Sequence, residues 1–377
     1  MRCIHFIGGR GVLIGLAAIA LTVAGCSSGK SSVPTASTGG GAAALAAAKA
    51  AIAPYTGHPS AFPGTAKLAS LPKAGSTFAF MQCSSPVCSI FAELLAAPTQ
   101  KLGVKLVNIN SGSSSTTAQA AAASILALDP AAVLVAASNP QIYGGYLKQM
   151  ADAGSVIAGG GTVGGKPYGV QDAVGGEHSD ALAGSLMADW VTVNKGPGAN
   201  VVFFGTPELT FSPVMQDGFA KELSKNCPSC RVGFQQLSVT TFGTTAPSQV
   251  ISYLQSHPST DTVVFASMEG ATGLAAALRN AHLSPATLGF APTASNLQDI
   301  AQGGLTAGLA LDFNVQIWAQ VNLAARLIAK QTTPESDLEP DMQFLSKSDL
   351  AGVDVSHGWT GYPDVAQRYA ALWGLSG

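Results

Sequence analysis

The sequence is short of charge. Only 11% of its 377 residues are Asp, Glu, Lys or Arg, against about 25% in an ordinary soluble domain. The formal net charge is −2, so no basic excess exists to neutralise phosphates, and we expect no nucleic-acid partner. Beyond the N-terminal segment, no apolar run reaches the roughly 18 residues of a membrane-spanning helix. What is present is a 47% hydrophobic chain, long enough for two or three domains with a substantial core.

Catalytic and metal-binding motifs are also scarce. The six His are scattered singly, and neither a G-x-S-x-G elbow nor a His-rich metal pair occurs. Residues 159–164 match G-x-G-x-x-G, and 160–166 match the start of a phosphate loop, but Pro167 stands where Ser or Thr is needed. Because no helix is expected after either pattern, we interpret this segment as a flexible turn. We therefore predict no cofactor, no metal and no enzymatic activity; an exported hydrolase, for which no nucleophile–base pair is evident, is the alternative class.

The N-terminus carries the features of an export signal. Arg2 and Arg10 precede a short apolar stretch that ends in Leu-Thr-Val-Ala-Gly before Cys26. This ending resembles a bacterial lipoprotein signal, in which small residues precede the cysteine that takes the lipid. We predict that residues 1–25 are removed and that acyl chains such as palmitate on Cys26 anchor the protein at the extracytoplasmic face of the cell membrane. An uncleaved anchor helix is the alternative.

Residues 26–73 have the composition of a tether. Ser and Gly dominate its start, residues 42–53 are rich in Ala, and prolines punctuate the remainder. Ser- and Gly-rich chains stay flexible, whereas Ala favours helix. We predict a lipidated flexible tether with one short Ala-rich helix that rests loosely on the body.

The remaining cysteines agree with export. Four of them form two local pairs, Cys83 with Cys88 and Cys227 with Cys230. An exported protein meets oxidants, so we predict two disulfides. A zinc site made by all four is the alternative, which the unequal spacings and the distance between the pairs disfavour.

From residue 76 onwards the chain alternates short apolar runs with helix-like stretches. Near-continuous apolar strands separated by helices predict parallel sheets covered on both faces. We predict an α/β fold of two doubly wound parallel-sheet lobes joined by a multi-strand hinge, with the change of lobe near the Gly175–Gly176 break. The predicted strands are 77–81, 104–109, 132–136, 155–158, 200–204, 262–266, 287–290 and 307–311; the predicted helices are 88–101, 116–127, 140–153, 178–194, 212–225, 246–257, 270–282 and 295–302.

Polar and aromatic side chains follow several of these strands. Ligands of doubly wound sheets bind outside the carboxyl ends of the strands, so these loops are expected to face one interlobe cleft. The candidate ligand-binding residues are Gln82, Asn139, Phe211, Glu269, Thr293, Asp312 and Phe313. The phenylalanines are suited to stacking and the others to hydrogen bonding, with Asp312 carrying the most weight. The alternative is that the Ser, Thr, Asn and Asp residues cap helices and that Glu269 is a surface carboxylate at a helix start.

The signal, the tether and the two α/β lobes together resemble a type I, ribose-binding-like periplasmic substrate-binding lipoprotein of a bacterial ABC importer. The resemblance covers about residues 77–374, through the 119–160 run and the segments Ala183-Gly184, 216–219 and 370–374. It implies three hinge strands between the lobes and a cleft that closes on ligand, with contacts near the candidate residues. No Arg lies in the candidate loops, which departs from the sugar binders of the family, so hydroxylated, amine-bearing and aromatic ligands all stay open.

The resemblance also implies partners and a domain plan. We expect a monomer that captures a small, sugar-like solute and delivers it to ABC permease subunits, held at the membrane through its N-terminal lipid. A ligand sensor that signals through a membrane partner is the alternative. The first lobe is expected to comprise residues 74–175 plus about 313–332, and the second lobe 176–312 plus about 333–377.

Overall fold

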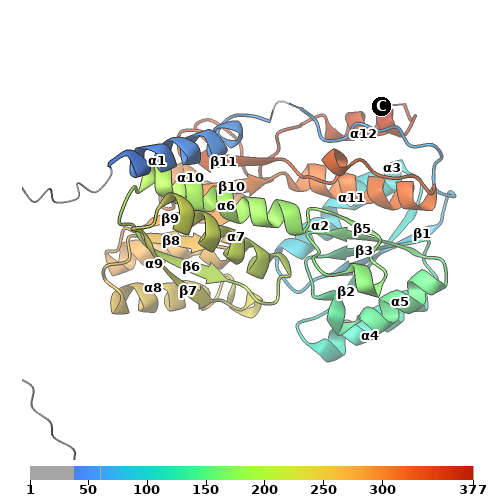
Figure 1. The fold of residues 1–377 in the computed structure, drawn as a ribbon. Coiled ribbons are helices and arrows are strands. Elements are labelled where there is room, and N and C mark those ends of the chain that lie inside the picture. Colours follow the sequence, from blue (N-terminus) through green and yellow to red (C-terminus); the bar gives the residue numbers. More distant parts are fainter. Residues whose placement is uncertain (1–37, 60, 377) are drawn as a thin grey trace, which may run out of the picture. The chain divides into compact units, whose positions relative to one another are not determined.

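Runs of Val, Ile, Phe and Ala build two separate sheets in the computed structural model, which describes residues 38–59 and 61–376 (Figure 1). The predicted signal peptide and the lipidation site Cys26 lie outside the described residues. The first sheet is entirely parallel, in the order β2-β1-β3-β4-β5. Its strands are β1 (Thr77–Gln82), β2 (Lys105–Asn110), β3 (Ala132–Ala136), β4 (Val156–Gly160) and β5 (Asp172–Val174).

The second sheet has the order β11-β10-β9-β8-β6-β7 and is parallel except for β11, which runs antiparallel to β10. Its strands are β6 (Asn200–Gly205), β7 (Arg231–Gln236), β8 (Thr262–Phe265), β9 (Ala286–Phe290), β10 (Ala307–Leu311) and β11 (Met342–Ser346). Two parallel-sheet lobes are therefore present, as predicted.

Helices cover both faces of each sheet because successive strand residues point to opposite faces. In the first lobe Phe78 and Phe80 pack in one cluster, whereas Ala79 and Met81 pack in another. One face is covered by α2 (Val87–Leu94), α3 (Ala96–Lys101) and α11 (Phe313–Ile328); the other is covered by α4 (Ser115–Leu126) and α5 (Gly144–Asp152).

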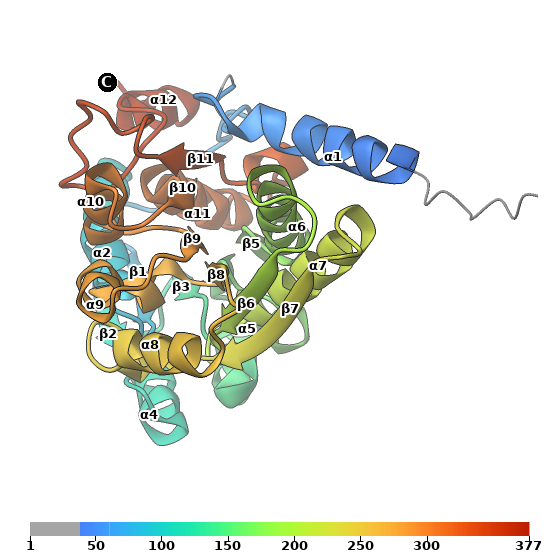
Figure 2. The same cartoon turned by 90° about the vertical axis from the view of Figure 1, so that its left-hand side faces the viewer.

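The second lobe is layered in the same way (Figure 2). Val202 and Phe204 face one helical layer, and Val201 and Phe203 face the other. The layers are α8 (Ala246–Ser256), α9 (Leu274–Ala281) and α10 (Ala294–Gln302) on one side, with α6 (Glu177–Asn194) and α7 (Phe211–Asn226) on the other.

Two glycines let α6 and α7 approach each other closely. A Cβ at Gly184 would lie 2.0 Å from the Met215 carbonyl oxygen, and one at Gly218 would lie 2.4 Å from that of Ala181. Both distances are far inside van der Waals contact, so any larger residue would push the helices apart. Because α6 begins just after the chain has left the first lobe, this contact fixes the position of its N-terminal turn.

The chain passes between the lobes at β5–α6, at β10–α11 and between α11 and β11, then returns after β11 to α12 (Val365–Leu372). Helix α12 packs on α11 and α3, and Tyr369 and Trp373 join the core of the first lobe. This differs from the expected boundary, which gave all of 333–377 to the second lobe. The reason is aromatic stacking: the Trp318 ring lies 5.4 Å from that of Trp373, between centroids, and 5.9 Å from that of Tyr369.

The N-terminal segment is bound to the body over more of its length than a flexible tether would be. Helix α1 (Thr38–Ile52) coincides with the predicted Ala-rich helix, and Ile52 packs in the core of the second lobe. Farther along, the Asp337 carboxylate accepts hydrogen bonds from the Thr65 and Ala66 amides, and the Leu68 amide donates to the Leu372 carbonyl. Buried backbone groups need partners, and the body supplies them here. Among the helices described, none has the length and apolar character needed to cross a membrane.

Candidate functional site

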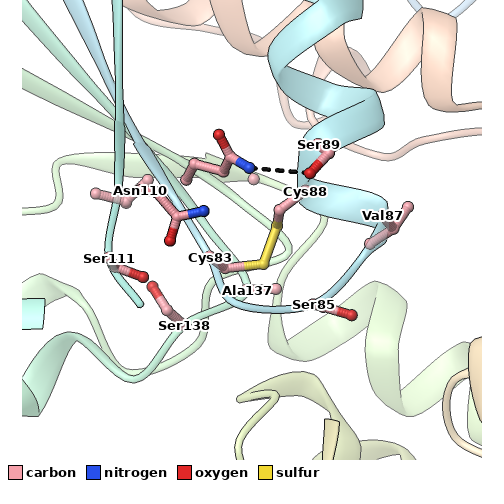
Figure 3. Close-up of a disulfide and its surroundings, with 12 residues drawn as sticks. Cys83, Ser85, Val87, Cys88, Ser89, Asn110, Ser111, Ala137 and Ser138 are labelled. Atoms are coloured by element: carbon pink, nitrogen blue, oxygen red, sulfur yellow. Dashed lines mark hydrogen bonds between the residues drawn. A yellow bond between two sulfur atoms is a disulfide. The ribbon is translucent and has the colours of Figure 1, made fainter. Parts of the chain in front are cut away.

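A cavity of about 50 Å³ lies between the two lobes, where the strand ends of both sheets meet the crossing segments. From the first lobe, Cys83, Val87 and Phe91 line it. These residues belong to the β1–α2 loop and the start of α2, which the Cys83–Cys88 disulfide ties together (Figure 3). The predicted Cys227–Cys230 disulfide is also present, in the second lobe and away from the cavity.

Glycines from the turn after β4 complete the wall of the first lobe. Gly160 ends β4 and Gly161 follows it; both line the cavity. Gly161 has a φ of +59°, which favours glycine, and a Cβ there would approach the Gln316 and Phe211 side chains to about 4 Å. The turn leads into a short 3-10 helix (Lys166–Tyr168) rather than an α-helix. As predicted from Pro167, the glycine pattern therefore lacks the helix N-terminus that binds phosphate.

Aromatic side chains line both sides of the cavity. Phe91 and Phe313 meet edge to face with their ring centroids 5.1 Å apart, and Phe211 and Phe290 do so at 6.0 Å. The first pair lies on α2 and α11, against the first sheet, and the second pair belongs to the second lobe. All four line the cavity, so an apolar or aromatic body would find ring surface on either side.

Glu269 reaches across the cleft to the first lobe. It lies in the 3-10 helix after β8 and is 4% exposed. Its Oε1 accepts a hydrogen bond from the Val87 amide at 2.7 Å, and its Oε2 accepts one from the Ser85 hydroxyl. Burial raises the pKa of the Glu269 carboxyl, while these bonds act in the opposite direction. The carboxylate thereby joins the lobes and occupies the N-terminus of α2.

Thr210 makes a second contact between the lobes. Its amide donates to the Ala137 carbonyl oxygen at 3.0 Å, and its hydroxyl oxygen accepts a hydrogen bond from the Val163 amide at 3.2 Å. With the Glu269 contact, the lobes therefore touch at two places in this structure. A solute can enter only if these contacts loosen, because solute pockets typically measure about 300–1,000 Å³.

Asp180 is the second carboxylate at the cavity. It lies in the first turn of α6, directly after the β5 crossing, and is 5% exposed. Its Oδ2 is fully buried, with no hydrogen-bond partner within the part of the chain that the structure describes. Burial, together with the charge of Glu339, raises the pKa of Asp180 to about 8. The carboxyl is held in an environment that favours its neutral form unless a cation or a strong donor approaches.

The structure brings three of the seven predicted contact residues together at the cavity: Phe211, Glu269 and Phe313. Asn139 caps the 3-10 helix Pro140–Ile142 through the Gln141 amide and faces an outer pocket of about 510 Å³ rich in Ser and Thr. Thr293 caps α10 and lines a shallower pocket beside Glu269. The Gln82 amide donates to Ser89, the bond drawn in Figure 3. Asn139 and Thr293 therefore cap helices in this structure, as the alternative interpretation of these residue types held.

Asp312 does not line the cavity, although it is fully buried at the β10–α11 crossing. Its Oδ1 accepts from the Val315 amide at 3.0 Å and caps α11. Its Oδ2 accepts from the Thr360 hydroxyl at 2.8 Å and the Gly361 amide at 2.7 Å. Burial still raises the pKa of the Asp312 carboxyl against these bonds. The prediction that Asp312 is the main ligand contact does not agree with this structure, because other residues of the protein already donate hydrogen bonds to both of its carboxylate oxygens.

Four polar residues of the cavity were absent from the predicted set: Ser179, Asp180, Ser267 and Gln316. Asp180 follows β5, a strand of three residues that leaves no clear apolar run. Gln316 lies one turn into α11, a helix that was not among the predicted ones. The sequence feature that could have identified Asp180 and Gln316 is a charged or amide residue in the first turn of each helix that follows a crossing between the lobes.

Two α/β lobes, a cavity lined by both, and crossing segments beside it define a ligand-binding protein of the two-lobed type. Residues 78–332 match the model of the periplasmic binding protein domain. Because this match spans more than half of the chain, the protein belongs to the periplasmic binding protein domain family, a class of solute-binding proteins. A comparison with curated protein sequences finds no significant match.

Solved structures share the fold at low sequence identity. A solute-binding protein of an ABC transporter from Agrobacterium vitis, with bound allitol, is 17% identical; the match covers 75% of this chain and 99% of that one, with a TM-score of 0.65. A glucose-galactose binding protein from Geobacillus stearothermophilus is 15% identical, covering 74% and 99% with a TM-score of 0.63. A carbohydrate transporter from Acidothermus cellulolyticus in complex with myo-inositol is 16% identical, covering 78% and 99% with a TM-score of 0.63.

Proposed function

We propose that this protein is an extracytoplasmic solute-binding lipoprotein that captures a small organic molecule between its lobes and delivers it to an ABC permease. The observation that carries the proposal is the cavity to which both lobes and the crossing segments contribute. A solute held there contacts both lobes at once and therefore favours their closed arrangement. The sugar and polyol ligands of the similar structures make hydroxylated solutes the first comparison class.

Delivery requires that the protein stay near its permease. Lipid on Cys26 would hold it at the membrane, and residues 27–37 then lead into the described chain. For this part of the proposal, Cys26→Ala should release the protein from the membrane fraction and abolish lipid labelling. A Cys26→Ala variant that is still processed and membrane-associated would refute lipid anchoring without touching the binding function.

Capture from a metabolite mixture tests the binding function. The purified chain is dialysed against a small-molecule extract, washed and denatured, and the released molecules are identified by mass spectrometry. We expect one solute at about one equivalent, and a stability gain of about 2.7 kcal/mol at 100 times its dissociation constant. A Phe211→Ala/Phe313→Ala double variant should lose the solute, while Phe234→Ala, at an exposed ring outside the cavity, should retain it. No retained solute, or equal retention by the cavity variant, would contradict the proposed function.

A further inference from the structure

The cavity holds two carboxyl groups and, within the described chain, no cationic side chain. Its polar side chains are Ser179, Asp180, Ser267, Glu269 and Gln316, and among the described residues that line it none is Lys, Arg or His. Solutes with a free carboxylate would meet two acidic groups and no cation, which is a costly arrangement in a buried site. The charge of the lining therefore selects against anions.

The two carboxylates differ in the partners that the protein gives them. Both oxygens of Glu269 are occupied by donors of the first lobe, at Val87 and Ser85. The Oδ2 of Asp180 has no partner among the described residues, and the same holds for the Oε1 of Gln316. Each of these side chains is only 5% exposed, so water in bulk does not satisfy them. Buried polar atoms are rarely left unpaired, which marks these two oxygens as places for ligand donors.

The two acceptors without partners among the described residues come from helices of different lobes. Asp180 begins α6, which packs in the second lobe, whereas Gln316 lies on α11, which packs on the first sheet. A group that donates to both oxygens would join the lobes through the ligand. A primary ammonium has three donors and one positive charge, so it satisfies both acceptors and neutralises Asp180. A hydroxyl has one donor and leaves one acceptor or the charge unpaired.

The rest of the lining is unsuited to a ligand with many hydroxyls. The ends of β4 and β9 contribute Gly160, Gly161 and Ala291, whose side chains form no hydrogen bonds. The remaining surface is mainly Phe, Leu, Val and Met side chain. Sugar hydroxyls placed against it would lose water without gaining partners, at a cost for each buried group.

We propose that the solute is a small primary amine with an apolar or aromatic body, whose ammonium donates to Asp180 and Gln316 while its body packs between the two pairs of Phe rings. This assignment rests on the proposed solute-binding function and names the class of solute for the same site. Asp180 is the specificity-determining residue, because it supplies the one charge of the cavity that its own chain leaves uncompensated.

Matched compounds of one shape test the charge requirement. Calorimetric titration of the full-length chain uses phenethylamine, 2-phenylethanol and 3-phenylpropionate, with butylamine and butanol as a smaller pair and glucose and myo-inositol as polyols. We expect each amine to bind at least tenfold more tightly than its alcohol, and the carboxylate to bind most weakly. Equal or tighter binding of an alcohol or of the carboxylate overturns the proposal.

A substitution then assigns the charge to one residue. Asp180→Asn should reduce amine affinity at least tenfold, leave the alcohol within about twofold and so remove the discrimination. Asp364→Asn is the matched control: this exposed carboxylate does not line the cavity and pairs with Arg368, and the discrimination should be unchanged. Retained discrimination in Asp180→Asn overturns the assignment even if that variant folds less well, since the amine and the alcohol are compared on the same protein.

The outcome also separates this proposal from the proposed function. If the polyols bind and the amines do not, the amine assignment fails and the solute-binding function stands. If neither polyols nor amines bind but dialysis against the extract returns a different solute, the amine assignment again fails and the solute-binding function again stands. If dialysis also returns nothing, the solute-binding function itself fails.

Discussion

Two buried aspartates lie at two crossings between the lobes, and they have opposite surroundings. Asp312, between β10 and α11, is 0% exposed and accepts hydrogen bonds from Val315, Thr360 and Gly361. Asp180, after the β5 crossing, is 5% exposed, and its buried Oδ2 has no partner in the described chain. Both follow a strand of one lobe and open or begin a helix that continues the connection.

The difference distinguishes a carboxylate with a structural role from one that is available to a ligand. Asp312 caps α11 and ties it to the 360–361 turn, so its charge is part of what holds the crossing in place. Asp180 is buried without a partner for its Oδ2 among the described residues, so ionising it in the empty cavity would cost stability. Such a cost is expected where a ligand later supplies the partner.

The largest expected effect is a loss of protein stability when Asp312 is replaced. Asp312→Ala removes a helix cap worth about 1 kcal/mol and leaves the Thr360 and Gly361 donors buried without an acceptor, at about 1–3 kcal/mol each. We expect the free energy of unfolding in urea to fall by about 3–5 kcal/mol. Under folded conditions the ligand affinity should stay within threefold, because Asp312 does not line the cavity. A variant of unchanged stability with a large loss of binding would reverse the assignment of the two aspartates.

Asp180, in contrast, is expected to lower the stability of the folded chain, by an amount that depends on pH. Its pKa is about 8 in the folded chain against an ordinary value of 3.8, so between these values the folded chain holds a proton that the unfolded chain has lost. Stability from this group therefore falls as pH rises through that window. Glu339 is the charged group that faces Asp180, and His178 pairs with Glu339 at 3.2 Å.

Asp180→Asn removes this titration. The stability of the variant relative to the native chain should rise between pH 5 and 8 by up to about 1.4 kcal/mol per pH unit, the limit for one proton. Urea unfolding at a series of pH values measures the difference. In Glu339→Gln, which lacks one cause of the raised pKa of Asp180, the fall in stability with rising pH should persist but end at a lower pH. A difference that is flat with pH would show that Asp180 ionises normally in the folded chain.

Removing either disulfide should have an effect of intermediate size. Closing loops with cysteines 5 and 3 residues apart should contribute about 2 kcal/mol each, so both Cys→Ser pair variants should lose similar stability. Only Cys83→Ser/Cys88→Ser should also weaken solute binding, because Cys83 lines the cavity and its loop positions Ser85 and Val87. Equal loss of affinity from the Cys227/Cys230 pair would show that the effect is global stability rather than the position of the loop.

Glu269 should give the smallest effect. Glu269→Gln keeps an acceptor for the Val87 amide but loses the charge, which lowers the strength of the bond by about 1 kcal/mol. The ligand-free lobes should then separate about fivefold more often. Single-molecule energy transfer between labels at the exposed Ile142 and Phe234 measures this. Glu208→Gln, at an exposed carboxylate bonded to Ser238 of its own lobe, should leave the distribution unchanged, and an equal shift there would argue against a specific contact.

Much of the fold follows from the sequence because eight strands are apolar runs with clear ends. The run at Ala132–Ala136 and the one at Ala307–Leu311 coincide with β3 and β10. Strands β5, β7 and β11 were missed: β5 has three residues, and β7 exposes Arg231, Gln235 and Gln236. The C-terminal helix was assigned to the wrong lobe because aromatic packing on Trp318 is a long-range contact that no local pattern encodes.

The site was predictable in part, for a physical reason. Strand ends identify the edge of a sheet but not the direction of each side chain, so Phe211, Glu269 and Phe313 reach the cavity whereas Asn139 and Thr293 cap helices. Capping and ligand contact require the same residue types, and only the partners distinguish them. For Asp312 the donors at Thr360 and Gly361 are decisive, and they lie far along the chain from it; for Asp180 the absence of a partner for its Oδ2 in the described chain is decisive, and no local pattern shows it.

The central claim is that Asp180 is neutral in the empty cavity and becomes the charged partner of a bound amine. Carbon-13 NMR of the Asp180 carboxyl, titrated with and without saturating phenethylamine, measures this directly. We predict a pKa near 8 without the amine and a fall of at least one unit with it, since a bound cation favours the carboxylate. An unchanged titration in the presence of bound amine, or a pKa near the ordinary value of 3.8 in the empty protein, would contradict the account.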